Sequence, residues 1–494
     1  MSVGTAAPGP RGARRALLVA AFAVTVAAHA QPYDTPPAPT APRPLDIATP
    51  TEQRLPNGLR VVLATRPGVR LVTAQLVVLS GSEVDPPRRA GLANLAAGLL
   101  TKGTQGRSAS AQAREAESLG GSLDSGAGWH HSQVSITVTV PQLDPALGLL
   151  GDAVMRPSFA QAELERLRAQ TLDGLKIAYS QPGTLALLAA DRLLFGAHPY
   201  GHPAEGTPAS LQRITRADLL ALHREHYRPE RAVLVLTGDL DDASALRLAS
   251  RHFGAWKAPR NVMSVRPALP TLPGAGLPPT MAAIDMPKAD QAAVVVAVPL
   301  PPLGSERATA AVLNSVLGGN FSSRLNQEIR IRRGLSYGVS SQLDARPQGG
   351  ALYIVVQTRN AAAAEVVTLV QAELDRLIAA PVPDEELAAR KAALIGGFGR
   401  SIETTAGLGN AMRSLVVAGL PVRELRGRIA ALTAVTADAV QRFAASHLAA
   451  GGRRVVVAGE GAEFGAALQA QAPALVTVKQ GALDLERDDG LAEP

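Results

Sequence analysis

The most informative stretch of this chain runs from residue 91 to residue 104 and reads GLANLAAGLLTKGT. Its first ten residues, Gly91 to Leu100, are almost all apolar or small and predict a buried helix. On a helix, positions i, i+3 and i+4 share one face, and here that face carries Asn94, Ala97 and Gly98. A neutral amide is a poor metal ligand, and alanine and glycine offer neither a ligand atom nor a base. This face therefore predicts no metal site.

The residues around this stretch predict two similar domains, each a sheet with helices on it. Strands are expected where β-branched residues run together or alternate, and helices where apolar residues recur with helical spacing. The same order of elements occurs in both halves, which indicates an internal duplication. The first half has expected strands at 59–64, 71–79, 134–140 and 232–236, and helices at 91–100, 108–119, 161–179, 185–195 and 216–226. The second half has strands at 292–298, 351–357 and 455–459, and helices at 308–317, 383–394 and from 436 onward.

Proline-rich stretches divide the chain. Residues 31–50 hold seven prolines and are expected to form an extended tether. Residues 257–280 hold six prolines and are expected to link the two domains. This division predicts an N-terminal domain at 51–256 and a C-terminal domain at 281–480. The acidic end, 481–494, is expected to be a tail without fixed structure.

The first 30 residues have the pattern of a secretory signal. Three arginines between residues 11 and 15 precede an apolar run at 16–28, and Ala28-His29-Ala30 fits a cleavage site after Ala30. The alternative is a membrane anchor, but the run is shorter than the ~20 residues that a spanning helix needs. No later stretch is long and apolar enough to span a membrane. We therefore expect an exported protein, most simply in a bacterial periplasm.

The composition excludes several classes of function. Of 494 residues, 46% are hydrophobic and 18% charged, as is typical of globular proteins. The absence of cysteine excludes disulfides, thiolate zinc sites and a cysteine nucleophile. The formal charge of +7 is modest for this length, and no basic cluster with interleaved aromatic residues indicates nucleic-acid binding.

The stretch at 91–104 resembles the motif G-x-A-H-x-x-E-H-M-x-F-K-G-T of the insulinase/pitrilysin-type zinc peptidases, the inverzincins. In that motif two histidines bind zinc and the glutamate polarises a water molecule. Asn94 stands at the place of the first histidine, Ala97 at that of the glutamate and Gly98 at that of the second histidine. The third zinc ligand of the family, a glutamate, corresponds to Gly174, and the neighbouring Asp173 alone is not a site.

The resemblance covers most of the chain after the expected signal. Family motifs are matched in order by Leu119-Gly120-Gly121, His198-Pro199-Tyr200-Gly201, Gly206-Thr207, Ser210-Leu211, His226-Tyr227-Arg228-Pro229 and Val235-Leu236-Thr237-Gly238-Asp239.

A second family motif is intact in the C-terminal half. The segment 318–325 reads GGNFSSRL and is followed by Arg330 and by Gly334-Leu335-Ser336-Tyr337. In the family, an arginine and a tyrosine seven residues apart contact the substrate peptide, and here they correspond to Arg330 and Tyr337. A guanidinium can bind peptide carbonyls and a phenol can donate to a developing oxyanion. The alternative is that Arg330 is a solvated residue at a helix end and Tyr337 a buried strand residue.

The resemblance implies an α+β fold of two homologous domains, each a mostly antiparallel sheet packed with helices. It also implies a non-catalytic subunit of the bacterial two-subunit type, inactive alone, that positions peptides for a zinc-bearing partner. The expected partners are a catalytic homologue with an intact H-x-x-E-H motif and a peptide substrate. No cofactor is expected in this chain, because the zinc belongs to the partner.

Two other hypotheses remain open. The chain could be a zinc-independent peptide-binding or assembly protein with no proteolytic role. It could also be an enzyme with a rebuilt metal site, for which His223 and His226, three residues apart on an expected helix, are the candidates. His198 and His202 lie in a Pro/Gly loop and are expected to be turn residues. His130 and His131 are expected to begin a strand and to point to opposite faces.

Overall fold

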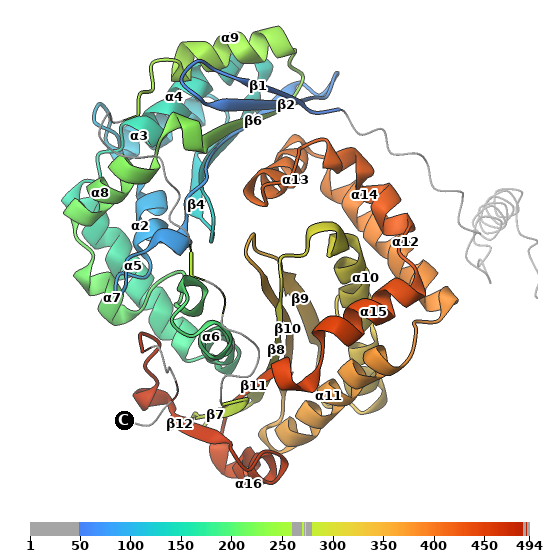
Figure 1. Ribbon diagram of the computed structural model, residues 1–494. Coiled ribbons are helices and arrows are strands. Elements are labelled where there is room, and N and C mark those ends of the chain that lie inside the picture. The colour runs from blue at the N-terminus through green and yellow to red at the C-terminus, as the bar shows by residue number, and fades with distance from the viewer. Residues whose placement is uncertain (1–48, 259–268, 271, 273–278, 488–490, 492–494) are drawn as a thin grey trace, which may run out of the picture. The chain divides into compact units, whose positions relative to one another are not determined.

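The computed structural model describes residues 49–258, 269–270, 272, 279–487 and 491. The expected signal peptide, nearly all of the proline-rich tether and most of the proline-rich linker lie outside these residues. Within them the chain forms two six-stranded sheets, each packed with helices (Figure 1). The predicted α+β fold is therefore confirmed.

The first sheet is built from the N-terminal half and is mostly antiparallel. Among the described strands of this sheet, only β2 and β6 pair in parallel. Its strands follow the order β1 (Thr51–Arg54), β2 (Arg60–Thr65), β6 (Ala232–Gly238), β3 (Leu71–Val78), β5 (Ser132–Thr139) and β4 (Asp124–Ala127). The helices of this half are α2 (Leu92–Leu99), α3 (Ala109–Ser118), α4 (Leu143–Met155), α5 (Gln161–Tyr179), α6 (Pro182–Phe195), α7 (Pro208–Arg213), α8 (Arg216–His226) and α9 (Asp242–Phe253).

The second sheet repeats this architecture. Its strands follow the order β12 (Val476–Lys479), β7 (Met281–Asp285), β11 (Arg454–Gly459), β8 (Ala292–Leu300), β10 (Gly350–Thr358) and β9 (Val339–Asp344), with β7 parallel to both of its neighbours. The helices of this half are α10 (Arg307–Leu317), α11 (Ala363–Ala379), α12 (Asp384–Ser401), α13 (Thr405–Val417), α14 (Glu424–Thr433), α15 (Ala437–His447) and α16 (Gly461–Gln471).

Two helices begin at threonine residues whose side chains cap them. Helix α8 begins where predicted, and Thr215 caps it: its hydroxyl accepts a hydrogen bond from the Asp218 amide, and the Asp218 carboxylate accepts one from the Thr215 amide. This reciprocal capping box satisfies two backbone donors that the helix would otherwise leave unpaired. Thr436 caps α15 in the predicted place through the amide of Ala439.

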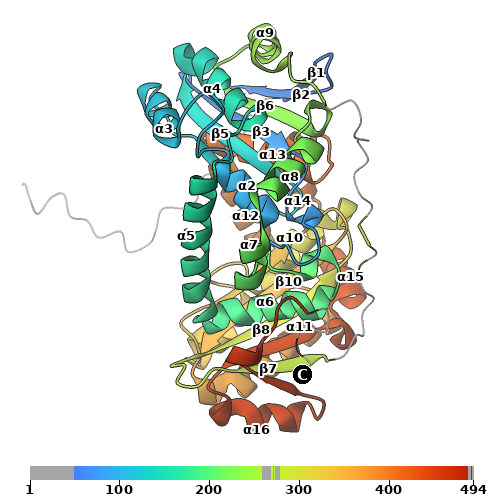
Figure 2. The same cartoon turned by 90° about the vertical axis from the view of Figure 1, so that its left-hand side faces the viewer.

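Two helices pack on the sheet of the opposite half. Helix α6 lies against β8 and β11, where Ala189 and Leu193 share a core with Val295 and Val456. Helix α13 lies against β3 and β6, where Met412 shares a core with residues of the first sheet. Figure 1 shows α6 beside the second sheet, and Figure 2 shows that it follows directly on α5. Each sheet is thus covered on one face by a helix from the other half.

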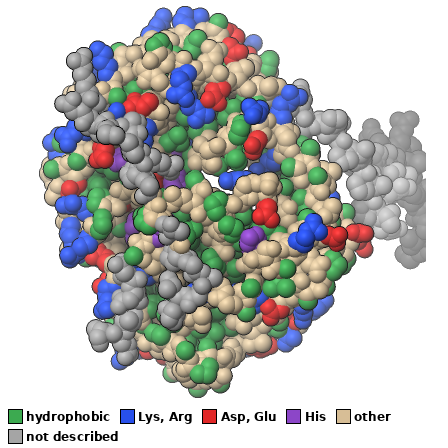
Figure 3. Space-filling model, in the orientation of Figure 1, with side chains coloured by type: hydrophobic (Ala, Val, Ile, Leu, Met, Phe, Trp, Pro, Cys, Tyr) green, Lys and Arg blue, Asp and Glu red, His purple; other side chains and the backbone are tan. Residues whose placement is uncertain are grey.

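The acidic end of the chain is ordered where it is described. Leu485 and Leu491 are buried, and the Glu486 carboxylate accepts hydrogen bonds from Arg213 and Thr207 at 2.9 Å and 2.5 Å. The expectation of a tail without fixed structure is therefore wrong for residues 484–487, because these contacts hold them against the N-terminal half. On the face shown in Figure 3, basic and acidic side chains are interspersed. Among the described residues, no helix has the length and hydropathy to cross a membrane.

Candidate functional site

Helix α2 forms where the stretch at 91–104 predicts it, and a buried carboxylate fixes its start. The Asp85 carboxylate accepts hydrogen bonds from the amides of Gly91 and Ala93, both at 2.9 Å. Gly91 adopts φ +92°, and a Cβ atom there would lie 2.7 Å from the carbonyl oxygen of Glu205, so only glycine fits. Burial raises the pKa of Asp85 well above its ordinary value, and the backbone hydrogen bonds oppose that rise.

The residues at the three positions of the missing zinc motif take part in packing and local hydrogen bonds. The Asn94 side-chain amide donates to the carbonyl of Ala204 at 2.6 Å and to the hydroxyl of Ser82 at 3.1 Å. Ala97 is fully buried. At Gly98 a Cβ atom would lie 3.0 Å from Cδ2 of Leu167 on α5, so this leucine fills the space next to the helix. A histidine at position 98 would have to displace it.

Gly174 lies on α5, the helix that packs against α2. It follows Leu167 by seven residues, which is close to two helical turns, so both face the same way. A Cβ atom at Gly174 would meet nothing within 4 Å. The neighbouring Asp173 is exposed and pairs with Lys176 at 2.8 Å. The structure thus brings the four degenerate positions onto two packed helices, but none of the four supplies a zinc ligand.

Zinc therefore does not fit these residues. Within the described ranges, no group of three or more His, Asp or Glu side chains could hold a metal ion. His223 and His226 do not form a rebuilt site either. The Nε2 atom of His223 donates to the carbonyl of Val154 at 2.7 Å, whereas Nδ1 of His226 lies 3.2 Å from the Arg231 guanidinium. Burial lowers the pKa of both imidazoles.

The other histidines have structural surroundings. His198 precedes the turn at Pro199–Gly201, as predicted for a turn residue, and its Nδ1 atom accepts a hydrogen bond from the amide of Tyr200 at 3.1 Å. His130 is buried between Tyr200 and Glu83. His130 and His131 precede β5, which begins at Ser132, so they do not open the strand as expected.

The second motif forms an exposed loop in the C-terminal half. After α10 the chain passes through 318–325 into a π-helical segment, Asn326–Arg332, and then into β9. π-helical segments are rare and occur often at functional sites. Three large apolar side chains are exposed here: Tyr337 is 90% exposed, Phe321 62% and Ile331 52%. The alternative that Tyr337 is a buried strand residue is therefore wrong.

Arg330 is the least compensated charge of this loop. Its guanidinium lies over the ring of Phe321, 4.5 Å from the ring centroid. The neighbouring Arg332 and Arg333 both bind the Glu328 carboxylate at 3.0 Å, and these hydrogen bonds, with Arg333 first, lower the pKa of Glu328. Within the described ranges, no carboxylate lies within ion-pair distance of Arg330. Its charge and donors are thus available to a ligand.

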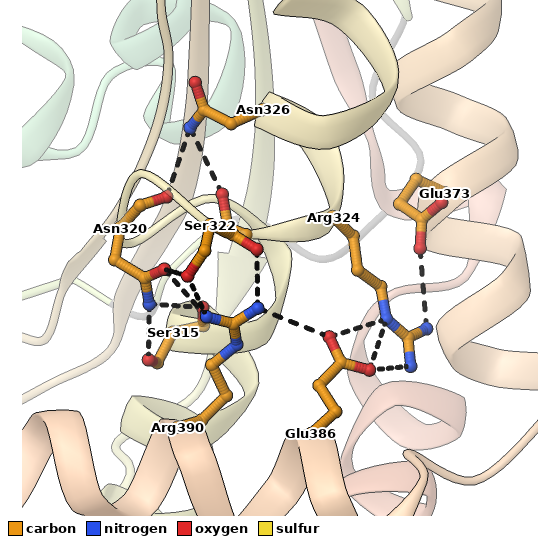
Figure 4. Close-up of polar contacts among 9 residues, drawn as sticks. Ser315, Asn320, Ser322, Arg324, Asn326, Glu373, Glu386 and Arg390 are labelled. Carbon is orange, nitrogen blue, oxygen red and sulfur yellow. Dashed lines mark hydrogen bonds and ion pairs between the residues drawn. The ribbon is translucent and has the colours of Figure 1, made fainter. Parts of the chain in front are cut away.

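A polar network below the loop holds it in place (Figure 4). The Arg390 guanidinium, from α12, donates to the Asn320 side chain at 2.9 Å and to the hydroxyl and carbonyl of Ser322, both at 2.6 Å. Asn326 ties the start of the π-helical segment to β9, donating to the carbonyl of Val339 at 2.7 Å and accepting from its amide at 3.1 Å.

Arg324 forms the other side of this network. It binds Glu386 at 2.8 Å and Glu373 at 3.5 Å. Burial alone would lower the pKa of Arg324, but these two carboxylates raise it above its ordinary value. The loop is therefore fixed at 320, 322, 324 and 326, while Phe321 between them projects outward.

Sequence reasoning missed Phe321, Glu386 and Arg390. Phe321 is part of the motif, but its exposure depends on the loop conformation. Arg390 lies 68 residues from Ser322 in the sequence, and only the packing of α12 under the loop connects them. The segment 334–338 also reads GLSYG and fits the G-x-S-x-G pattern. It leads into strand β9 rather than into a helix, and the Ser336 hydroxyl bonds Gly338, so it is no nucleophile elbow.

Comparison with known proteins gives a consistent assignment. The model of the insulinase family, peptidase family M16, matches residues 60–203, and the model of the peptidase M16 inactive domain matches residues 213–394. A Mycobacterium tuberculosis protein named as an uncharacterized zinc protease is 31% identical over 364 residues, covering 73% of this chain and 82% of that protein. A Helicobacter pylori protein named as a non-peptidase homolog is 26% identical over 355 residues, covering 70% and 79%.

Solved structures agree with the sequence comparisons. The crystal structure of a peptidase M16 inactive domain from Pseudomonas fluorescens superimposes with a TM-score of 0.76 at 27% identity, covering 83% of this chain and 98% of that one. A protease from Helicobacter pylori gives a TM-score of 0.78 at 17% identity, over 84% of this chain and 100% of that one, and shares the fold. The chain belongs to the insulinase family, peptidase family M16, and lacks the residues of that family's zinc motif.

Proposed function

We propose that this protein is the non-catalytic, substrate-positioning subunit of a zinc metallopeptidase heterodimer that acts on peptides. Its partner would be a homologue with an intact H-x-x-E-H motif, which alone holds the zinc. The pattern of the first 30 residues supports a periplasmic location for the pair.

One observation carries the proposal: the positions of the family's zinc motif are filled in this chain, whereas the loop with the family's arginine and tyrosine is exposed. At the zinc positions, Asn94 is hydrogen-bonded in place and Leu167 fills the space beside Gly98. The loop with Arg330 and Tyr337 is instead presented to solvent and braced from below by Arg390. A phenol that is 90% exposed contributes little to folding, so its place in an otherwise fixed loop points to a ligand.

The chemistry of these side chains suits an extended peptide. Arg330 can donate to two carbonyl oxygens at once, and Tyr337 can donate to a third. Neither group can activate water or polarise a scissile carbonyl as zinc does. The role that fits is positioning and charge stabilisation at a reaction centre in another subunit.

The test is turnover of an internally quenched peptide by this chain mixed with a homologue that carries an intact H-x-x-E-H motif and binds zinc. We expect Arg330→Ala to lower turnover by roughly 10- to 100-fold and Tyr337→Phe by about 10-fold, as loss of charged and neutral hydrogen bonds in a transition state would. The zinc content of the pair should not change.

Arg332→Ala is the matched control, because its side chain is 71% exposed and, among the described residues, pairs with Glu328 alone, one helical turn away. Full turnover with both Arg330→Ala and Tyr337→Phe would remove the positioning role. In that case a peptide-binding or assembly role without proteolysis would be the better account.

A further inference from the structure

A polar pocket of about 280 Å³ lies where α13 crosses the first sheet. The sheet face that it occupies is the one opposite to helices α2 and α4. On β3, Val72, Ala74 and Leu76 point to the core below those helices, so Thr73 and Gln75 point the other way. Besides these two, the residues that line the pocket include Asp124 of β4, Gln133 of β5, and Asn410 and Arg413 of α13.

Arg413 is a partly desolvated cation in this pocket. Its guanidinium donates to the side-chain oxygen of Gln133, a neutral group. Burial lowers the pKa of Arg413, which marks a charge that its surroundings do not compensate. In the described part of the chain, no carboxylate lies within ion-pair distance of it: Asp124 is exposed at the border of the pocket. His131 adds no second positive charge beside it, because burial lowers the pKa of its imidazole to about 4.

Gln75 supplies an acceptor that no described residue satisfies. Its side chain is 3% exposed. Gln75 is one of the residues that line the pocket. Its amide nitrogen donates to the Asn410 side chain at 2.9 Å, but its amide oxygen is buried and has no hydrogen-bond partner among the described residues. Buried polar atoms are almost always paired, so this oxygen indicates a donor that the pocket receives from outside.

We propose that this pocket binds the carboxyl-terminal end of a peptide. The terminal carboxylate would bind Arg413, and the last amide N–H would donate to the Gln75 side-chain oxygen. The pocket is smaller than the ~300–1,000 Å³ of sites for drug-sized ligands, which suits one end of a chain. Strand β4, an edge of the first sheet, borders the pocket and offers unpaired backbone groups to an extended peptide. This site shares no residue with the loop of Arg330 and Tyr337.

The probe is tetra-alanine with a fluorescein label at its N-terminus, made as the free acid and as the C-terminal amide. Binding to the full chain is measured by fluorescence anisotropy. We expect the acid to bind at least tenfold more tightly than the amide. Arg413→Gln should abolish this difference. Gln133→Glu should abolish it as well, because the new carboxylate pairs with Arg413 in place and keeps the shape of the side chain.

Three further measurements complete the test. Arg442→Gln, at an exposed position on α15, should keep the preference for the acid. Arg330→Ala should keep the acid-to-amide ratio whether or not overall affinity falls, which separates this site from the proposed function. N-acetylalanine should compete far more weakly than the peptide acid. Equal binding of acid and amide, or an undiminished preference in folded Gln133→Glu, would overturn the proposal. Equal competition by N-acetylalanine would overturn its peptide part.

Discussion

Gly409→Leu is expected to destabilise the protein by about 3–4 kcal/mol, because α13 touches the first sheet at this glycine. A Cβ atom at Gly409 would lie 3.1 Å from the side-chain nitrogen of Gln75 and 3.4 Å from the hydroxyl of Thr237. Both neighbours are buried, so a leucine must push the helix away from the sheet. Overpacking of this kind costs about 1–3 kcal/mol.

The displaced helix would also lose its polar contacts with the sheet. The hydroxyls of Thr73 and Thr405 lie 2.9 Å apart, and the hydroxyl of Thr237 donates to the Thr405 carbonyl at 2.7 Å. Each such hydrogen bond contributes about 1 kcal/mol. Urea unfolding followed by circular dichroism measures the total loss in the free energy of unfolding.

Gly427→Leu on α14 is the matched control. A Cβ atom at Gly427 would meet nothing within 4 Å, and the position is exposed. Leucine is the better helix former by up to about 1 kcal/mol, so this variant should be as stable as the parent or more so. Equal stability of the two variants would mean that α13 does not hold the first sheet as described.

Arg390→Met is the second substitution with a large expected effect, because it removes the brace of the Arg330 loop while keeping most of the side-chain volume. The three hydrogen bonds from Arg390 hold Asn320 and Ser322 on either side of Phe321. Hydrogen bonds to charged groups contribute about 1.5–3 kcal/mol each, but the exposed Ser322 can bond water instead, and its hydroxyl still donates to Asn320, so only part of that sum is lost. We expect a loss of about 2–4 kcal/mol in unfolding free energy.

The same variant should lower turnover of the mixed pair, although Arg390 does not reach the exposed side of the loop. If Arg390 acts only by positioning, its effect and that of Arg330→Ala should not add in the double variant. Arg376→Met is the control, because the Arg376 side chain is 59% exposed in its pair with Glu373 and such pairs contribute less than about 1 kcal/mol. Additive losses would show that Arg390 does not work through Arg330.

The elements with a strong local signal are those that the sequence predicts well. Helix α5 has the predicted bounds, and helices α8 and α15, capped by Thr215 and Thr436, begin where expected to within one residue. Strand β4, by contrast, reads DSGA and has no strand-forming composition. It forms because β5 offers it an antiparallel partner, with Asp124 opposite Ser135. Pairing of this kind depends on tertiary contacts that no local pattern reports.

The packing of α6 and α13 on the sheet of the opposite half could not be predicted for a related reason. The apolar side chains of α6 indicate a buried face, but they do not say which sheet covers it. Prediction of the candidate site from the sequence has the same limit. The motif positions are readable one by one, whereas the filling of the space at Gly98 by Leu167 depends on how closely α2 and α5 approach. The bracing of Ser322 by Arg390 likewise joins segments that are distant in the sequence.

In the proposed function, this chain contributes to peptide cleavage only through a zinc-bearing partner. The most direct measurement is hydrolysis of a quenched peptide by this chain alone, by its zinc-bearing homologue alone, and by an equimolar mixture in the presence of zinc. The account predicts no hydrolysis by this chain alone and a clear rise when the two are mixed. Hydrolysis by this chain alone, or a mixture no more active than the homologue by itself, would contradict it.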